Sequence, residues 1–296
     1  MTYVRHEPSD DFDPIPRMPS WVTSGRIETL EDGAFLSGSA LSHLHHVLSS
    51  DDLPHSLLRE RLALRAAEAC VAHAGRPERA GELRDAIAFL QPGDEPGPAG
   101  EIYLSWRRAV ERPVSVRSLR RALAVSEPDQ IAQRLEARKR APVVRAAAVL
   151  EAVLGNSSRD FTSALLLADA ALTLALGWVH VTPLLAYGLK RTDLRKTGDD
   201  LRLACHRAVV LAATEASREL VDLTRRANRL RAIAHKLRAR GSDEAVTLFL
   251  VLDAVAPAAL TSLRSDRAAR RFCDRLVELG VARELTGRDT FRLYGV

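Results

Sequence analysis

The residues best suited to a specific chemistry are arginines spaced along the stretch from Ser265 to Leu279. On a helical wheel this stretch has one apolar face, and four arginines point away from it: Arg267, Arg270, Arg271 and Arg275. Asp274 and Glu278 follow on the exposed side, nearer the C-terminal end. Three of the arginines lie in the N-terminal half, where a recognition helix usually meets base edges and phosphates. The pattern predicts contact with DNA.

Two further arginines follow in a predicted β-hairpin. The runs 281–286 and 290–294 are β-prone, and a turn containing Gly287 separates them. We expect Phe291 and Leu293 to face the core. Arg288 and Arg292 would then point outward, where they would touch phosphate or the minor groove.

A group of histidines raises the alternative of a metal site. His43, His45 and His46 are close in sequence, and His43 shares a helix face with His46. No carboxylate stands at a matching spacing, so surface or interfacial histidines are the favoured interpretation. Asp94 and Glu95 could hold a cation, but their loop of prolines and glycines is more simply interpreted as exposed.

Two aspartates are candidates for a catalytic carboxylate. Asp169 stands in an apolar helical run, and a carboxylate buried there must find a partner. An ion pair with an arginine is the first interpretation, and a catalytic acid with a shifted pKa is the second. An enzyme would require Asp85, Asp169 or the histidines to converge in one pocket.

Known catalytic and cofactor-binding motifs are absent from the sequence. It has no GxSxG, HExxH or dinucleotide-binding fingerprint. The three cysteines, Cys70, Cys205 and Cys273, are far apart and form no CxxC pair, which argues against both a disulfide framework and zinc. We therefore predict no catalytic residue, no cofactor and no metal, and the sequence favours a protein that is not an enzyme.

The elements that must position the arginines are helical. Ala, Leu and Arg, which are good helix formers, dominate the composition, whereas aromatic residues make up only 5%. The sequence therefore predicts an all-α protein. The net charge is +5, and the basic excess lies in the C-terminal third, as expected if that end meets a polyanion. A solvated helix face is the alternative.

Nothing in the sequence predicts a targeting or membrane segment. The first residues are acidic and contain prolines, without the apolar core of a signal peptide. The most apolar stretch, 164–181, is interrupted by Asp169, Gly177 and His180, and it is too short to span a bilayer. We expect a cytoplasmic protein with no membrane partner.

Four segments are predicted along the chain. Residues 1–33 are expected to form a disordered or loosely docked arm, and 34–200 a multi-helix bundle domain. Proline and glycine in 91–100 predict a loop that cannot continue a helix. The helices are expected over 34–48, 57–74, 77–90, 102–110, 116–125, 129–140, 142–154 and 161–176.

The third segment, 201–240, is predicted to be one long basic helix. Apolar residues recur at alternating spacings of four and three from Val209 to Leu237, which is a heptad register with a narrow seam. The basic residues fall off that seam. The seam can pack inside this chain's own bundle or against the same helix of a second protomer, which would make a homodimer through 209–237.

The fourth segment, 241–296, has the element order of a winged helix-turn-helix. Gly241 ends the long helix, Ser242 is the expected cap of a helix over 244–254, and a short second helix starts at Pro257. Ser265 is the expected cap of the third helix, and the hairpin follows. The terminal part, SDRAARRFCDRLVELGVARELTGRDTFRLYGV, resembles the winged helices of bacterial regulators and Fic-type proteins. The His and Gly-Asn-Gly-Arg run of Fic chemistry is absent.

Most of the chain after the arm resembles the bacterial family called domain of unknown function 1403. The similar blocks are RLALRAAEA, LRDAIAFLQPGDEPGPAGEIYLSWRR, LLLADAALTLALGW and RELTGRDTFRLYG. This resemblance implies one shared architecture and brings no activity, substrate or catalytic residue.

Together these features favour binding of double-stranded DNA, by a transcriptional regulator or a DNA-associated accessory protein. The first alternative is a protein–protein adaptor whose winged helix docks a partner and whose long helix serves as the interface. An enzyme of the helical domain is the second alternative.

Overall fold

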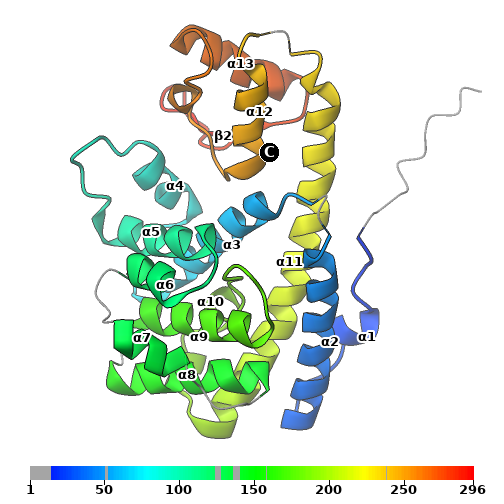
Figure 1. Cartoon of the computed structure of the whole chain (residues 1–296), viewed down its shortest axis with the longest axis vertical. Coiled ribbons are helices and arrows are strands. Elements are labelled where there is room, and N and C mark those ends of the chain that lie inside the picture. The colour runs from blue at the N-terminus through cyan, green and yellow to red at the C-terminus, as the bar shows by residue number, and fades with distance from the viewer. Residues whose placement is uncertain (1–14, 51–52, 124–127, 136–140, 158, 238) are drawn as a thin grey trace, which may run out of the picture.

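The computed structural model describes residues 15–50, 53–123, 128–135, 141–157, 159–237 and 239–296. Over these residues the chain is mostly helical, which confirms the all-α class. Figure 1 shows an elongated molecule with α8 (Pro142–Asn156) near one end and the C-terminal helices at the other. The long helix α11 (Gly198–Ala234) runs along one side between them.

The first ten helices form the larger part of the molecule. They are α1 (Ser20–Thr23), α2 (Leu30–Leu48), α3 (His55–His73), α4 (Ala80–Ala88), α5 (Gly97–Glu111), α6 (Val116–Leu123), α7 (Pro128–Leu135), α8 (Pro142–Asn156), α9 (Phe161–Ala175) and α10 (Leu185–Gly188). A 3-10 turn, η1 (Asp193–Arg195), precedes the long helix. A helix is present in the described part of each of the eight predicted ranges, and most boundaries differ by a few residues. Positions 124–125 and 136–140 of two predicted helices lie outside the described residues.

The structure describes the second half of the predicted arm. Residues 1–14 lie outside the described residues, but Ile15 and Val22 are buried in the core, and α1 packs on α2 and α11. Helix α2 begins at Leu30 because Thr29 and Asp32 form a capping box, in which each side chain accepts a hydrogen bond from the other's backbone N–H. The segment from residue 15 onward is therefore docked on the body.

The predicted loop over 91–100 is shorter than expected, because α5 begins at Gly97. Pro98 lies in the first turn of this helix, where the N–H that proline lacks would have no partner in any case. Gly97 has φ +68°, a left-handed value that favours glycine at this entry. Proline and glycine here mark the start of the helix as well as the loop before it.

Helix α11 (Gly198–Ala234) buries the predicted seam within the chain's own fold. The seam residues from Val209 to Leu230 are buried, and α11 packs against α2, α3, α8 and α10. The side chains from Val209 to Leu230 thus pack against other helices of the same chain. The helix starts three residues before the predicted Leu201 and ends at Ala234 rather than at residue 240.

The C-terminal elements follow in the order α12 (Ser242–Val251), η2 (Pro257–Ala259), α13 (Asp266–Glu278), β1 (Arg283–Glu284) and β2 (Tyr294–Gly295). The two strands pair antiparallel, with Arg283 opposite Gly295. Val255, between α12 and η2, forms an additional antiparallel bridge to Tyr294. Phe249 of α12 and Leu276 of α13 belong to the same hydrophobic core as Trp106 of α5, so this end is continuous with the body.

The two caps predicted in this region differ in outcome. Ser265 caps α13 as expected, because its side chain accepts a hydrogen bond from the N–H of Ala268. Ser242 is the first residue of α12 rather than its cap, and its hydroxyl donates to the carbonyl of Leu237. Gly241 occupies the cap position with φ +84°, and its backbone lies against Ser262, so a side chain there would collide.

One side chain of the hairpin points the opposite way from the prediction. Leu293 is buried as expected, but Phe291 is 70% exposed. Its backbone has φ +54°, which breaks the strict alternation of a strand before β2 begins. The Phe291 ring packs edge-on instead against Phe89, the residue that follows α4.

Within the described ranges, no helix has the combination of length and apolar character needed to cross a membrane.

Candidate nucleic-acid interface

The arginines of α13 are exposed because the helix is amphipathic. Its buried face consists of four side chains, Ala269, Phe272, Cys273 and Leu276, as the wheel predicts. Arg267, Arg270 and Arg271 are exposed, and no ion pair forms to them in the part of the chain that the structure describes. Arg275 is also exposed, but its Nη1 lies 3.0 Å from Oε2 of Glu278. Three cationic side chains of α13 are therefore free to contact a partner.

The two arginines of the hairpin are engaged within the chain. The Nη2 atom of Arg288 lies 2.6 Å from Oδ2 of Asp85 in α4, and its guanidinium stands 6.0 Å from the centre of the Phe89 ring. Arg292 lies 3.5 Å from Asp289, and its Nε donates to the carbonyl of Arg288. The turn of the hairpin is thus held against α4.

A cavity of about 480 Å³ separates α13 from this hairpin. Arg270 lines it together with Asp274, Phe89 and Phe291. Acidic and basic groups are mixed on its walls, because Asp266 and Asp289 contribute as well as Arg292. Arg270 therefore shares the cavity with acidic side chains.

A buried carboxylate joins the C-terminal elements to the body. Asp253, after α12, is 1% exposed, and its two oxygens each lie 2.5 Å from the Nε of an arginine, Arg61 in α3 and Arg84 in α4. Arg61 also donates to the backbone carbonyl of Val296, at 2.9 Å. Two guanidinium groups compensate one buried charge, so α12 and the last residue are fixed to α3 and α4.

This ion-pair network is not predicted from the sequence. Asp253 stands between Leu252 and Val255 in an apolar run. The same feature, an aspartate among apolar residues, makes Asp169 a candidate in the sequence. The identity of the two arginines could not be read from the sequence, since they are more than 160 residues away. Glu60, next to Arg61 in sequence, belongs to a separate pair: it accepts from Nε of Arg107 at 3.0 Å, and burial raises its pKa.

The residues considered for an enzyme do not come together. Nδ1 of His45 accepts a hydrogen bond from the indole N–H of Trp178, at 2.8 Å. Burial lowers the pKa of His43. No group of three metal-ligating side chains is found in the described ranges. Asp85 binds Arg288 near the C-terminal elements.

Asp169 has a structural role that replaces the expected ion pair with an arginine. Its carboxylate is fully buried and accepts hydrogen bonds from the backbone N–H groups of Leu184, Leu185 and Ala186, at 2.8–3.1 Å. These are N–H groups at the start of α10, which its own helical bonds leave free. Burial raises the pKa of Asp169 to about 7, against the opposing effect of the three hydrogen bonds.

Comparison with known proteins agrees with the sequence resemblance. No curated protein matches the chain. The family model described as protein of unknown function (DUF1403) matches residues 6–296. Since the match extends over nearly the whole sequence, the chain belongs to the DUF1403 family.

Proposed function

We propose that residues 241–296 form a winged helix-turn-helix that binds double-stranded DNA, with α13 as its recognition helix. One observation carries the proposal. Arg267, Arg270 and Arg271 are exposed and lack acidic partners within the described residues, and they lie in the first half of a well-capped helix. That half of a recognition helix enters the major groove and meets base edges and phosphates.

The order of elements supports this assignment. A first helix, a bridging residue at Val255, a short second helix, a third helix and an antiparallel hairpin follow one another over 242–295. In a winged helix the third helix reads the groove and the hairpin is the wing. Figure 1 shows these elements at one end of the molecule's long axis, away from α7 and α8.

The wing contributes less than α13 in this arrangement. Arg288 would have to exchange its ion pair with Asp85 for a phosphate. Arg275 is paired with Glu278, although both are well exposed and exchange is inexpensive. We therefore expect Arg267, Arg270 and Arg271 to supply most of the affinity.

Binding of labelled genomic fragments, followed by fluorescence anisotropy at low salt, tests the proposal. Replacement of Arg267, Arg270 and Arg271 by Ala should weaken binding by about 100-fold, at roughly 1 kcal/mol for each arginine removed. The slope of log K against log salt should also become shallower, by about 0.9 for each phosphate that the variant no longer neutralises.

The matched control is a second triple Ala variant, at Arg117, Arg120 and Arg121. These arginines are exposed on α6, and their removal changes the net charge by the same amount. The control should bind DNA as the unmodified protein does. Equal losses in both variants, or no binding by the unmodified chain at low salt, would overturn the proposal.

A protein–protein adaptor is the second candidate, and one observation favours it. Residues 241–296 hold eight arginines and eight acidic side chains, so the segment as a whole has no net charge. A docking surface for a protein partner tolerates this balance better than a DNA-binding surface does. If the Arg267/Arg270/Arg271 variant loses a co-purifying protein while the unmodified chain binds no DNA, the adaptor function replaces the first.

A further inference from the structure

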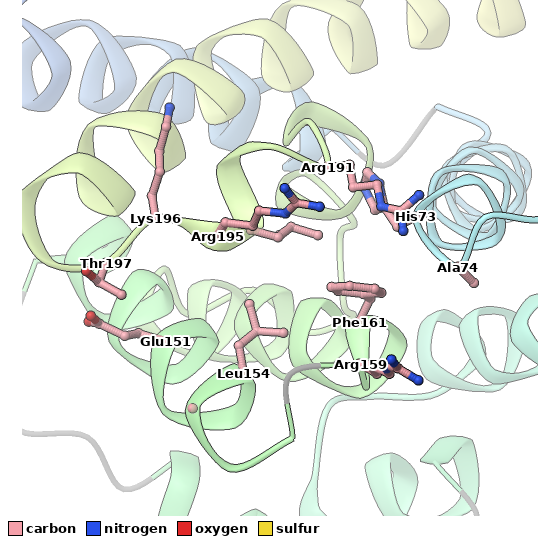
Figure 2. A pocket seen from close by; sticks show the side chains of 12 residues that line it. His73, Ala74, Glu151, Leu154, Arg159, Phe161, Arg191, Arg195, Lys196 and Thr197 are labelled. Atoms are coloured by element: carbon pink, nitrogen blue, oxygen red, sulfur yellow. The ribbon is translucent and has the colours of Figure 1, made fainter.

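A cavity of about 740 Å³ lies far from the proposed DNA-binding helix. It is bounded by the end of α3, the end of α8, the start of α9 and the segment that leads into α11. Figure 2 shows Arg191 and Arg195 on one side, with Phe161 and Leu154 on the opposite side. The volume is in the range of small-molecule sites, about 300–1,000 Å³.

The walls of this cavity carry an excess of positive charge. Arg159, Arg191 and Arg195 line it, and none of them has an ion-pair partner among the residues that the structure describes. Lys196 is different, because it binds Asp193 at 2.6 Å and points away from the cavity centre in Figure 2. In Figure 2 the guanidinium of Arg195 points toward Arg191, whereas that of Arg159 lies beyond Phe161 at the edge of the cavity.

The acidic side chain on the wall is already engaged. Glu151 accepts a hydrogen bond from the backbone N–H of Gly198, the first residue of α11, at 2.9 Å. Its charge thus compensates the positive end of that helix. Glu151 therefore does not pair with the arginines of the cavity, and an anionic group from outside the chain can bind them.

A buried polar atom at the same cavity lacks a partner. His73 is only 6% exposed, and its Nε2 makes no hydrogen bond to any residue that the structure describes. The imidazole packs edge-on against Phe161, with 6.3 Å between the ring centres. An unsatisfied buried nitrogen costs free energy, which a ligand atom within reach would recover. Phe161 and Leu154 supply an apolar wall beside it.

We propose that this cavity binds a small phosphate ester that also carries a flat apolar group, a ligand about the size of a mononucleotide. Guanidinium forks match the oxygen atoms of phosphate and bind them with charge-assisted hydrogen bonds. The ring of Phe161 offers a surface on which a flat group can pack. The inference is independent of DNA binding, since the cavity shares no residue with 241–296.

Isothermal titration calorimetry of the full chain tests the proposal with AMP, adenosine, inorganic phosphate and citrate as probes. We expect AMP to bind at least about tenfold more tightly than adenosine, which lacks the phosphate. Inorganic phosphate should compete with AMP. Phe161→Leu should weaken AMP binding and leave the affinity for inorganic phosphate unchanged.

The double variant R191A/R195A should weaken AMP binding by about tenfold or more. R117A/R120A, which removes the same charge from exposed positions on α6, should bind AMP as the unmodified chain does. Unchanged circular dichroism of both variants shows that the fold is kept. No binding of AMP or phosphate at millimolar concentration, an equal loss in both variants, or binding of citrate alone would overturn the phosphate assignment.

Discussion

At the scale of single residues, two buried aspartates have their carboxylates stabilised in different ways. Asp169 accepts backbone N–H groups and forms no ion pair within the described part of the chain, whereas Asp253 lies between two arginines. The carboxylate with hydrogen bonds alone keeps a raised pKa, about 7, because desolvation outweighs the three donors. Stability should therefore depend on pH through Asp169.

The expected direction of that dependence follows from proton linkage. The pKa of Asp169 is raised by folding from its ordinary value of 3.8, so the folded state binds the proton more tightly than the unfolded state does. The stabilisation by this proton is present near pH 4 and is lost as the pH rises to about 7. Asp169→Asn removes the titration, and it also loses one acceptor for the N–H groups of α10, at a cost of about 1–3 kcal/mol.

Urea unfolding of both proteins at pH 5, 6, 7 and 8 measures this effect. The free-energy advantage of the unmodified chain over Asp169→Asn should shrink as the pH rises. Other titrating groups, such as His43 and His206, whose pKa values are lowered, cancel in the difference because both proteins contain them. A difference that stays constant from pH 5 to pH 8 would contradict the assignment.

At the scale of elements, the periodicity of apolar residues predicts local features such as helices, their buried faces and their caps. The helices and the buried seam of α11 follow from apolar residues at helical spacing, and Ser265 follows from its position before α13. The side chain of Phe291 turns outward because its φ is positive and Phe89 is nearby. An alternating pattern of apolar residues does not show the φ angle at one position. It also does not show a contact with a residue 202 positions away in the sequence.

Some features of the candidate site also follow from the sequence, and others do not. The exposure of Arg267, Arg270 and Arg271 was predictable, since it depends only on the wheel of one helix. The pairing of Arg288 with Asp85 was not, because it depends on how the hairpin docks on α4. The large basic cavity also escaped prediction, because its walls come from four separate segments of the chain.

The cap of α13 gives a prediction at this scale. Ser265→Ala removes the oxygen that accepts the N–H of Ala268, which should cost about 1 kcal/mol and fray the turn that carries Arg267. Ser265→Asp should restore the cap, since aspartate serves at this position as well. Thermal unfolding measures the loss and the rescue. An alanine variant as stable as the original, or an aspartate variant as unstable as the alanine one, would argue against the cap.

At the scale of the whole molecule, the ion pairs of Asp253 decide whether the C-terminal elements are an appendage or part of the body. Asp253 joins α12 to α3 and α4, and the core is continuous across the same boundary. The two arginines are largely buried, with side chains 11% and 15% exposed. Loss of the central charge would leave both guanidinium groups without compensation.

Asp253→Asn should therefore destabilise the protein by about 3–5 kcal/mol, the usual cost of removing one partner of a buried ion pair. The matched control is Asp243→Asn, which neutralises an exposed aspartate in the first turn of α12 and should cost under about 1 kcal/mol. Guanidinium chloride unfolding compares the two variants, and hydrogen exchange locates the change. If Asp253 fixes the C-terminal elements, exchange should rise in α3 and α4 as well as in α12. Faster exchange confined to 241–296, with α3 and α4 unaffected, would mean that those elements fold and move on their own.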